Sequence, residues 1–131
     1  MEDLLHLAQR MMLRAYAPYS KFHVGAAVRA EDGSIHGACN VENAAYPQGL
    51  CAEAGAISAL VAAGHKHVLE CLVVGPGPAV ITPCGGCRQK LREFASDETP
   101  IHLCGPDGLH RTVTLGQLLP LSFGPHHLTR P

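Results

Sequence analysis

The sequence predicts an α/β fold, a three-layer α/β/α sandwich on a mixed five-stranded sheet. Helical and strand-like patterns interleave along the chain, and the first two strands form a hairpin. Residues 68–75 (VLECLVVG) form a nearly continuous apolar run, which is typical of a central strand buried on both faces. A length of 131 residues suits one domain that buries a core without disulfide bridges, so we predict a single domain over residues 1–131.

The N-terminal elements are predicted to be a helix and a hairpin. Residues 3–16 carry apolar side chains at roughly helical spacing, and the segment APYS at 17–20 ends that helix. Residues 21–41 alternate in polarity around the turn sequence EDGS at 31–34, as expected for two antiparallel strands.

The remaining elements are predicted from apolar spacing and from turn residues. They are a loop (43–49), a small-residue helix (51–64), the buried strand (68–75), a proline-containing loop (76–83), a third helix (84–95), two strands joined by a turn (101–115), and a short helix with an irregular tail (115–128).

Composition and charge exclude several classes of protein. Apolar residues make up 47% and charged residues 16% of the chain, which indicates a compact globular protein rather than a disordered one. The formal net charge is −1 and Lys and Arg form no run, so we expect no nucleic-acid partner. The N-terminus resembles neither a signal peptide nor a membrane span, so we expect a cytoplasmic protein without a membrane partner.

Three of the six cysteines are candidate metal ligands. Cys84 and Cys87 lie three residues apart in the first turn of a predicted helix, and Cys51 starts another. Helix N-termini favour thiolates, and zinc with three protein ligands keeps a fourth position for water, as catalytic sites require. The C-x-x-C pair alone also fits a redox motif or half of a structural zinc site.

The other cysteines are expected to be small buried hydrophobes, because Cys39, Cys71 and Cys104 lie in predicted strands. Cys104 is the candidate fourth ligand if the zinc site is structural. Glu53 follows Cys51 by two residues, so it does not share a helix face with that cysteine. It is therefore a poor ligand but well placed to reach a metal-activated water from the side, where an acid can transfer protons in hydrolysis.

The spacing C-x-E followed by P-C-x-x-C resembles the three-cysteine form of the zinc nucleoside and nucleobase deaminase signature. The segments PYSKFHVGAAV, NVENAAYPQGLCAE, TPCGGCRQ and LLPLSFGP resemble the small homotetrameric cytidine deaminases in the same order, from residue 18 to 125. The resemblance implies the cytidine deaminase-like fold, one Zn²⁺ per subunit, and a homotetramer with shared active sites. The implied reaction is hydrolytic deamination of cytidine and deoxycytidine to uridine and deoxyuridine, with release of ammonia, in pyrimidine salvage.

The resemblance also assigns a role to each residue of the predicted site. It implies that Cys51, Cys84 and Cys87 hold zinc, and that Glu53 moves protons during the reaction. The residues implied to contact the nucleoside are Phe22 against the pyrimidine ring, Asn40 and Glu42 at the ribose hydroxyls, Ala44 and Tyr46 from a neighbouring subunit, and Phe123, which closes over the base from another subunit. From the residues alone, Phe22 would be assigned to the core.

One position departs from the family pattern. Many three-cysteine members resemble CAER at this place, with an arginine that hydrogen-bonds the zinc thiolates, whereas Ala54 and Gly55 follow Glu53 here. Three thiolates and a hydroxide exceed the charge of zinc and weaken it as a Lewis acid, and the two helix N-termini offset part of that excess. We expect Arg88, the one cation within the two zinc motifs, to compensate for the missing charge.

Three other functions share some of these features. A zinc deaminase for another aminopyrimidine, such as a nucleoside antibiotic, would carry the same zinc motifs, and NVEN at 40–43 with SFGP at 122–125 favours free nucleosides instead. A non-catalytic zinc module would need a fourth protein ligand and no role for Glu53. A thiol–disulfide protein would use Cys84 and Cys87 without metal.

Overall fold

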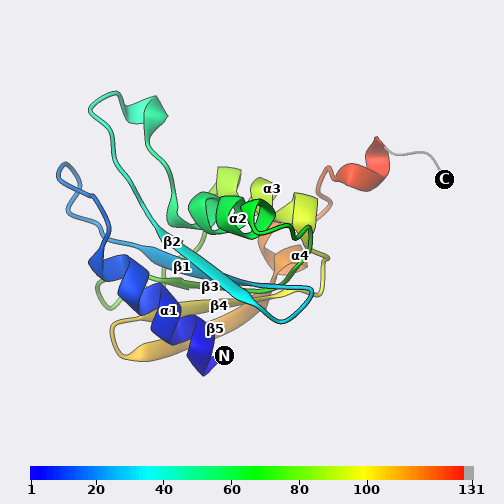
Figure 1. The fold of residues 1–131 in the computed structure, drawn as a ribbon, viewed down its shortest axis with the longest axis horizontal. Coiled ribbons are helices and arrows are strands. Elements are labelled where there is room, and N and C mark those ends of the chain that lie inside the picture. Colours follow the sequence, from blue (N-terminus) through cyan, green and yellow to red (C-terminus); the bar gives the residue numbers. More distant parts are fainter. Residues whose placement is uncertain (129–131) are drawn as a thin grey trace.

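The computed structural model describes residues 1–128 and contains a five-stranded sheet with helices on both faces (Figure 1). The strands are β1 (Gly25–Ala30), β2 (Ile35–Cys39), β3 (Val68–Val74), β4 (Pro100–Gly105) and β5 (Gly108–Thr114). The helices are α1 (Glu2–Leu13), α2 (Ala52–Ala62), α3 (Gly85–Phe94) and α4 (Leu115–Leu118), with 3-10 turns at Tyr46–Gln48 and Pro125–His127. Residues 129–131, the end of the predicted single domain, lie outside the described residues.

The sheet is mixed, with the strand order β2-β1-β3-β4-β5. Strand β1 pairs antiparallel with β2 and with β3, β3 pairs parallel with β4, and β4 pairs antiparallel with β5. The predicted fold class is therefore confirmed, including the central position of the apolar strand β3.

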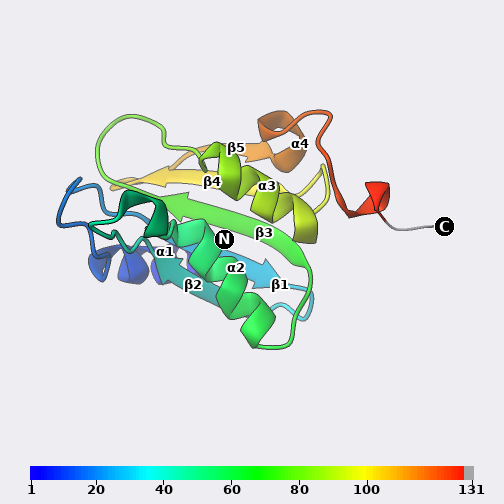
Figure 2. The same ribbon diagram turned by 90° about the horizontal axis from the view of Figure 1, so that it is seen from above.

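The three layers enclose two apolar cores. Helix α1 packs on one face of the sheet, where Leu4 and Ala8 contact residues such as Leu72. Helices α2 and α3 cover the other face, where Leu60 and Leu91 lie in the larger core. Figure 1 shows α1 and the α2–α3 pair on opposite sides of the sheet, and Figure 2 shows α2 and α3 next to each other. Within the described residues, none of the helices has the length and apolar character that crossing a membrane requires.

The topology places the start of α2 beside the start of α3. Strands β2 and β3 run parallel to each other because both are antiparallel to β1, so α2 is a crossover between parallel strands, as α3 is between β3 and β4. Both crossovers step in the same direction along the sheet, and the right-handed rule therefore puts both helices on one face. The two helix N-termini consequently meet at the carboxyl ends of β2 and β3.

Helix α1 is shorter than predicted and ends at Leu13 rather than at residue 16. The backbone of Tyr16 is used by another segment: its N–H donates to the carbonyl of Asn40 at 3.0 Å, and its carbonyl accepts from the N–H of Glu42 at 2.8 Å. A helical Tyr16 could not make these bonds. Gly25 then fits against α1, since a Cβ at this position would lie 1.9 Å from the carbonyl oxygen of Ala8.

Candidate active site

Three cysteine sulfurs converge where α2 and α3 begin. Cys51 is the N-cap residue of α2, Cys84 is the N-cap residue of α3, and Cys87 is buried in the first turn of α3. The sulfurs of Cys51 and Cys84 are 3.8 Å apart, and all three sulfurs lie within 4.8 Å of one another. The structure therefore brings together the three residues that the spacing singled out.

The environment of these sulfurs favours a bound cation. Burial raises the pKa of Cys51 and of Cys87, whereas the backbone N–H of Cys87 lowers the pKa of Cys84. Three thiolates this close repel one another, so together they require a positive partner. Thiolates are preferred ligands of Zn²⁺, and a set of three leaves one coordination position free, so the donor set fits zinc in a catalytic site.

The remaining cysteines do not complete this set. Cys104 is buried on the α1 face of the sheet, where it packs near Leu4 and Ala8, while the three sulfurs lie on the face covered by α2 and α3. A structural site with Cys104 as fourth ligand is therefore wrong. Cys71 is buried as predicted, but Cys39 is half-buried rather than buried, because β2 is an edge strand of the sheet.

Glu53 lies in the first turn of α2 and is 4% exposed. Its side chain lines the same cavity as Cys51 and Cys84. Burial raises its pKa, because a charged carboxylate is poorly solvated there. A raised pKa brings a carboxyl group closer to neutrality, where it can both accept and donate a proton.

The cavity at the cysteines has a volume of about 360 Å³ and is lined mainly by apolar atoms. Of the predicted nucleoside contacts, Phe22, Asn40 and Glu42 line it. The lining residues that sequence reasoning missed are Ser20, Val24, Ala52, Val73, Ile81 and Thr82. Four of them lie within the motifs given above, whereas Val73 and Ile81 lie outside those motifs and look like ordinary core residues in the sequence.

Asn40 fixes the backbone that carries Phe22. Its Oδ1 accepts from the N–H of Val24 at 2.9 Å, and its Nδ2 donates to the carbonyl of Phe22 at 2.8 Å. The side-chain amide thus replaces a strand partner for residues that precede β1. Phe22 lies before β1 and is 44% exposed, so the assignment to the core is wrong and its ring is free to contact a ligand.

Glu42 is held by the segment that follows α1. One of its carboxylate oxygens accepts from the backbone N–H groups of Tyr19 and Ser20 at 3.0 and 3.1 Å, and the other accepts from the Ser20 hydroxyl. These hydrogen bonds lower the pKa of Glu42, which keeps the carboxylate charged. Asn40 and Glu42 therefore order opposite ends of residues 19–24 at the cavity wall.

The three residues expected to act across subunits lie outside this cavity. Ala44 and Tyr46 are exposed on the loop between β2 and α2, and the ring of Tyr46 makes an edge contact with Tyr19. Phe123 is 56% exposed and stacks on His127 with ring centroids 4.9 Å apart. Their roles therefore depend on contacts between copies of the chain and stay predictions.

Arg88 is bound to oxygen atoms. Within the described residues, the hydrogen bonds of its guanidinium go to the carbonyl of Pro83 at 2.8 Å, the hydroxyl of Thr82 at 3.0 Å and the carbonyl of Leu118 at 2.8 Å. These contacts tie α4 and the loop before Cys84 to α3. They favour a positioning role over direct bonding to the thiolates.

We expect Arg88→Ala to lower the free energy of unfolding by about 1–3 kcal/mol, because hydrogen bonds from a charged group are lost and two partly buried carbonyl groups lose a donor. Zinc should remain bound at the wild-type stoichiometry. Urea titration and metal analysis check both results, with Lys90→Ala, an exposed position on the same helix, as the control. Loss of zinc without loss of stability would instead support charge compensation by Arg88.

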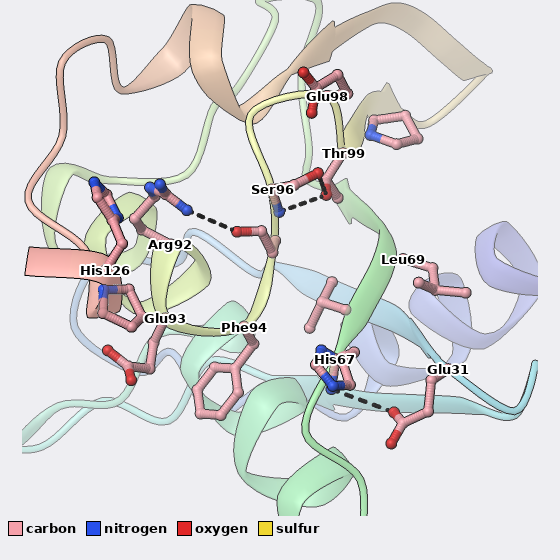
Figure 3. Close-up of a pocket in the computed structure, with 14 residues that line it drawn as sticks. Glu31, His67, Leu69, Arg92, Glu93, Phe94, Ser96, Glu98, Thr99 and His126 are labelled. Carbon is pink, nitrogen blue, oxygen red and sulfur yellow. Dashed lines mark hydrogen bonds between the residues drawn. The ribbon is translucent and has the colours of Figure 1, made fainter. Parts of the chain in front are cut away.

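A larger cavity lies elsewhere and contains none of the predicted site residues. It has a volume of about 830 Å³ and lies among the end of α3, the start of β3 and the C-terminal 3-10 turn (Figure 3). Charged side chains of both signs, including Arg92 and Glu93, line it together with Phe94. Because its groups do not form a catalytic set, cavity size alone does not indicate the active site.

Comparison with known proteins identifies the family. The model of the cytidine and deoxycytidylate deaminase zinc-binding region matches residues 1–103. The chain belongs to this family. It is 38% identical over 128 residues to the cytidine deaminase of Sporosarcina psychrophila, covering 98% of this chain and 94% of the relative. It is 42% identical over 116 residues to that of Mycobacterium tuberculosis, covering 88% and 84%.

A solved structure supports the same conclusion. The crystal structure of cytidine deaminase from Burkholderia pseudomallei aligns with a TM-score of 0.87 at 39% identity, over 93% of this chain and 98% of that chain. The prediction of a zinc-dependent enzyme of this family is confirmed. The zinc cofactor is confirmed as well, and the cluster of three cysteines could hold the ion.

Proposed function

We propose that this chain deaminates cytidine and deoxycytidine hydrolytically to uridine and deoxyuridine, with release of ammonia. One observation carries the proposal: two of the three converging sulfurs and the buried carboxyl group of Glu53 line a single cavity, together with Phe22 and Glu42. Cys51, Cys84 and Cys87 would hold one zinc ion per subunit. A small polar ligand with a planar ring fits an apolar cavity that carries a few polar groups.

Glu53 is the proposed proton shuttle. When bound, zinc lowers the pKa of a water molecule and makes it a nucleophile near neutral pH. Glu53 accepts the proton released from this water and passes it to ring N3 of the base. Once the water oxygen has added to C4 of the base, Glu53 takes the remaining proton from that oxygen and delivers it to the amino group, so that the C4–N bond breaks and ammonia leaves. Each transfer needs a carboxyl group that can be protonated, and the burial of Glu53 favours that form.

The walls of the cavity would orient the nucleoside. Phe22 offers an aromatic face to the pyrimidine ring. The Glu42 oxygen that accepts from the Ser20 hydroxyl keeps acceptor capacity, and the amide nitrogen of Asn40 keeps a second hydrogen. These groups suit the donor and acceptor pattern of ribose hydroxyls.

Contacts between copies would complete the site. Tyr46, which is 79% exposed, and Phe123 lie outside their own chain's cavity, as expected if they serve a neighbour in a homotetramer. Glu42 also lines a second cavity together with Tyr19 and Tyr46, which supports a role for that loop near the proposed active site. We place the enzyme in cytoplasmic pyrimidine salvage, acting on free nucleosides rather than on nucleic acid, in keeping with six free cysteines and a net charge of −1.

Ultraviolet-monitored turnover tests this function. The purified protein should convert cytidine and deoxycytidine with stoichiometric release of ammonia, at a rate that scales with its zinc content. An aminopyrimidine nucleoside antibiotic serves as the competing substrate. If the zinc-loaded protein deaminates the antibiotic but neither nucleoside, the substrate assignment is wrong and the runner-up deaminase is correct.

A further inference from the structure

A second group of metal-ligating side chains lies at the opposite end of α2 from the cysteines. Asp32 and Ser34 belong to the turn between β1 and β2, and His36 follows in β2. His65 comes from the connection between α2 and β3. Two elements distant in the sequence therefore bring two imidazoles and a carboxylate together at this end of the sheet.

These side chains surround one oxygen atom. The hydroxyl oxygen of Ser34 lies 2.6 Å from Oδ1 of Asp32, 2.9 Å from Nε2 of His36 and 3.5 Å from Nε2 of His65. The other carboxylate oxygen of Asp32 is 3.6 Å from the same nitrogen of His65. The serine hydroxyl thus occupies the centre of three groups that each offer a metal-ligand atom.

A second carboxylate, that of Glu31, faces the other ring nitrogen of His65. Oε2 of Glu31 lies 3.6 Å from Nδ1 of His65, on the side of the ring away from Ser34. The carboxylate of Glu31 is itself held by the backbone N–H groups of Lys66 and His67, at 3.3 and 3.2 Å, and Figure 3 shows the bond from His67. A carboxylate facing the far nitrogen of a histidine is the usual support for a metal-binding imidazole, because it leaves Nε2 as the ligand atom.

We propose that this cluster is a second metal site, which takes a divalent cation that favours nitrogen and oxygen ligands, such as Zn²⁺. Its ligands would be Nε2 of His36, Nε2 of His65 and a carboxylate oxygen of Asp32. Two imidazoles with one carboxylate are a known ligand set for zinc. The site is separate from the cysteine cluster in position and in donor type.

Binding needs the ligand side chains to move closer together, because within the described residues the cysteine cluster is the group whose ligand atoms all lie within 4.8 Å of one another. Zinc–ligand distances are about 2.0–2.2 Å, so the three groups must close in around the centre as the Ser34 hydroxyl rotates away. His36 and His65 are half-buried and Asp32 is exposed, so the side chains have room to turn. The C-terminal end of α2 points its partial negative charge toward this region, which favours a cation. A bound ion would tie the β1–β2 turn to the α2–β3 connection.

Equilibrium dialysis of the zinc-loaded enzyme against buffered free Zn²⁺ tests the proposal. The wild type should bind a second equivalent per chain, and His36→Ala or His65→Ala should abolish that equivalent while the first is retained. Added Zn²⁺ should raise the melting temperature of the wild type but not of these two variants, because a ligand of the native state stabilises it. Cytidine turnover should be unchanged in both, since neither residue lines the cysteine cavity.

Three control variants make the result decisive. His6→Ala, at an exposed position on α1, and the double variant His126→Ala/His127→Ala in the tail should keep the second equivalent. Ser34→Ala should also keep it, because the hydroxyl is displaced rather than bound. The proposal fails if the wild type binds one equivalent alone, if the extra zinc disappears with the tail histidines, or if both cluster variants retain it. In that case His65 is simply the partner of Glu31 and Asp32, and His36 that of the Ser34 hydroxyl.

Discussion

Replacement of Glu53 by glutamine is expected to lower kcat for cytidine by about 10²–10⁴-fold, the usual contribution of general acid–base catalysis. Glutamine has nearly the same size and can occupy the same buried position, but it can neither accept the proton from water nor deliver one to the leaving amino group. Because Glu53 lies outside the cluster of three sulfurs, the variant should keep its full zinc content.

Turnover and metal analysis on the same samples measure both effects. Glu98→Gln is the matched control, since Glu98 is exposed at the other end of the molecule, at the cavity of about 830 Å³. That control should retain wild-type kcat and zinc. Wild-type turnover by a zinc-loaded Glu53→Gln variant would rule out the proton shuttle. Loss of zinc together with loss of turnover would show that Glu53 acts on the metal site itself.

The arrangement of the sheet and the meeting of the cysteines were predictable because both follow from chain topology. Parallel strands joined by right-handed helical crossovers place the helix starts at one edge of the sheet. Residues 51 and 84–87, each at the start of a helix, therefore had to approach one another once the strand order was set. The buried strand β3 was recognisable from its apolar run, since a central strand is covered on both faces.

Details that depend on tertiary hydrogen bonds were not predictable. The pattern of apolar residues extends the first helix to residue 16, but the backbone of Tyr16 bonds to residues 40 and 42 instead. Phe22 fits the alternation of a strand, yet its carbonyl accepts a hydrogen bond from the side chain of Asn40 instead of from a strand partner. Its ring is exposed. The sequence also offers Arg88 as a cation beside the thiolates, whereas the fold supplies three oxygen acceptors for it.

The same reasoning explains which functional residues the sequence could identify. The spacing of the cysteines and the nearby acid indicated a metal site, and the resemblance to the deaminase family favoured a catalytic site over a structural one. Val73 and Ile81 line the cavity as ordinary apolar residues, and nothing in their types distinguishes them from the core. The metal ligands and the catalytic acid of a site can therefore be predicted from the sequence more readily than the apolar residues that line its cavity.

Removal of a zinc ligand should have the other large effect. We expect Cys84→Ala to lose stoichiometric zinc and to lower cytidine turnover by at least about 10³-fold, because the metal contributes several kcal/mol to catalysis. Cys84 caps α3 and lies 3.8 Å from the Cys51 sulfur, so two ligands would remain without the third. The melting temperature should fall as well, since the binding free energy of a metal that binds the native fold adds to stability.

Cys39→Ala is the matched control, because Cys39 is a free, half-buried cysteine on β2 that does not belong to the sulfur cluster. It should retain zinc, turnover and the wild-type melting temperature. A strong chelator applied to the wild type should reproduce the Cys84→Ala phenotype, and added Zn²⁺ should reverse the effect of the chelator but not that of the mutation. A thiol–disulfide protein would behave differently: its exchange activity would disappear with Cys84 and survive chelation. Full turnover by a metal-free wild type would contradict both the ligand assignment and the proposed hydrolytic function.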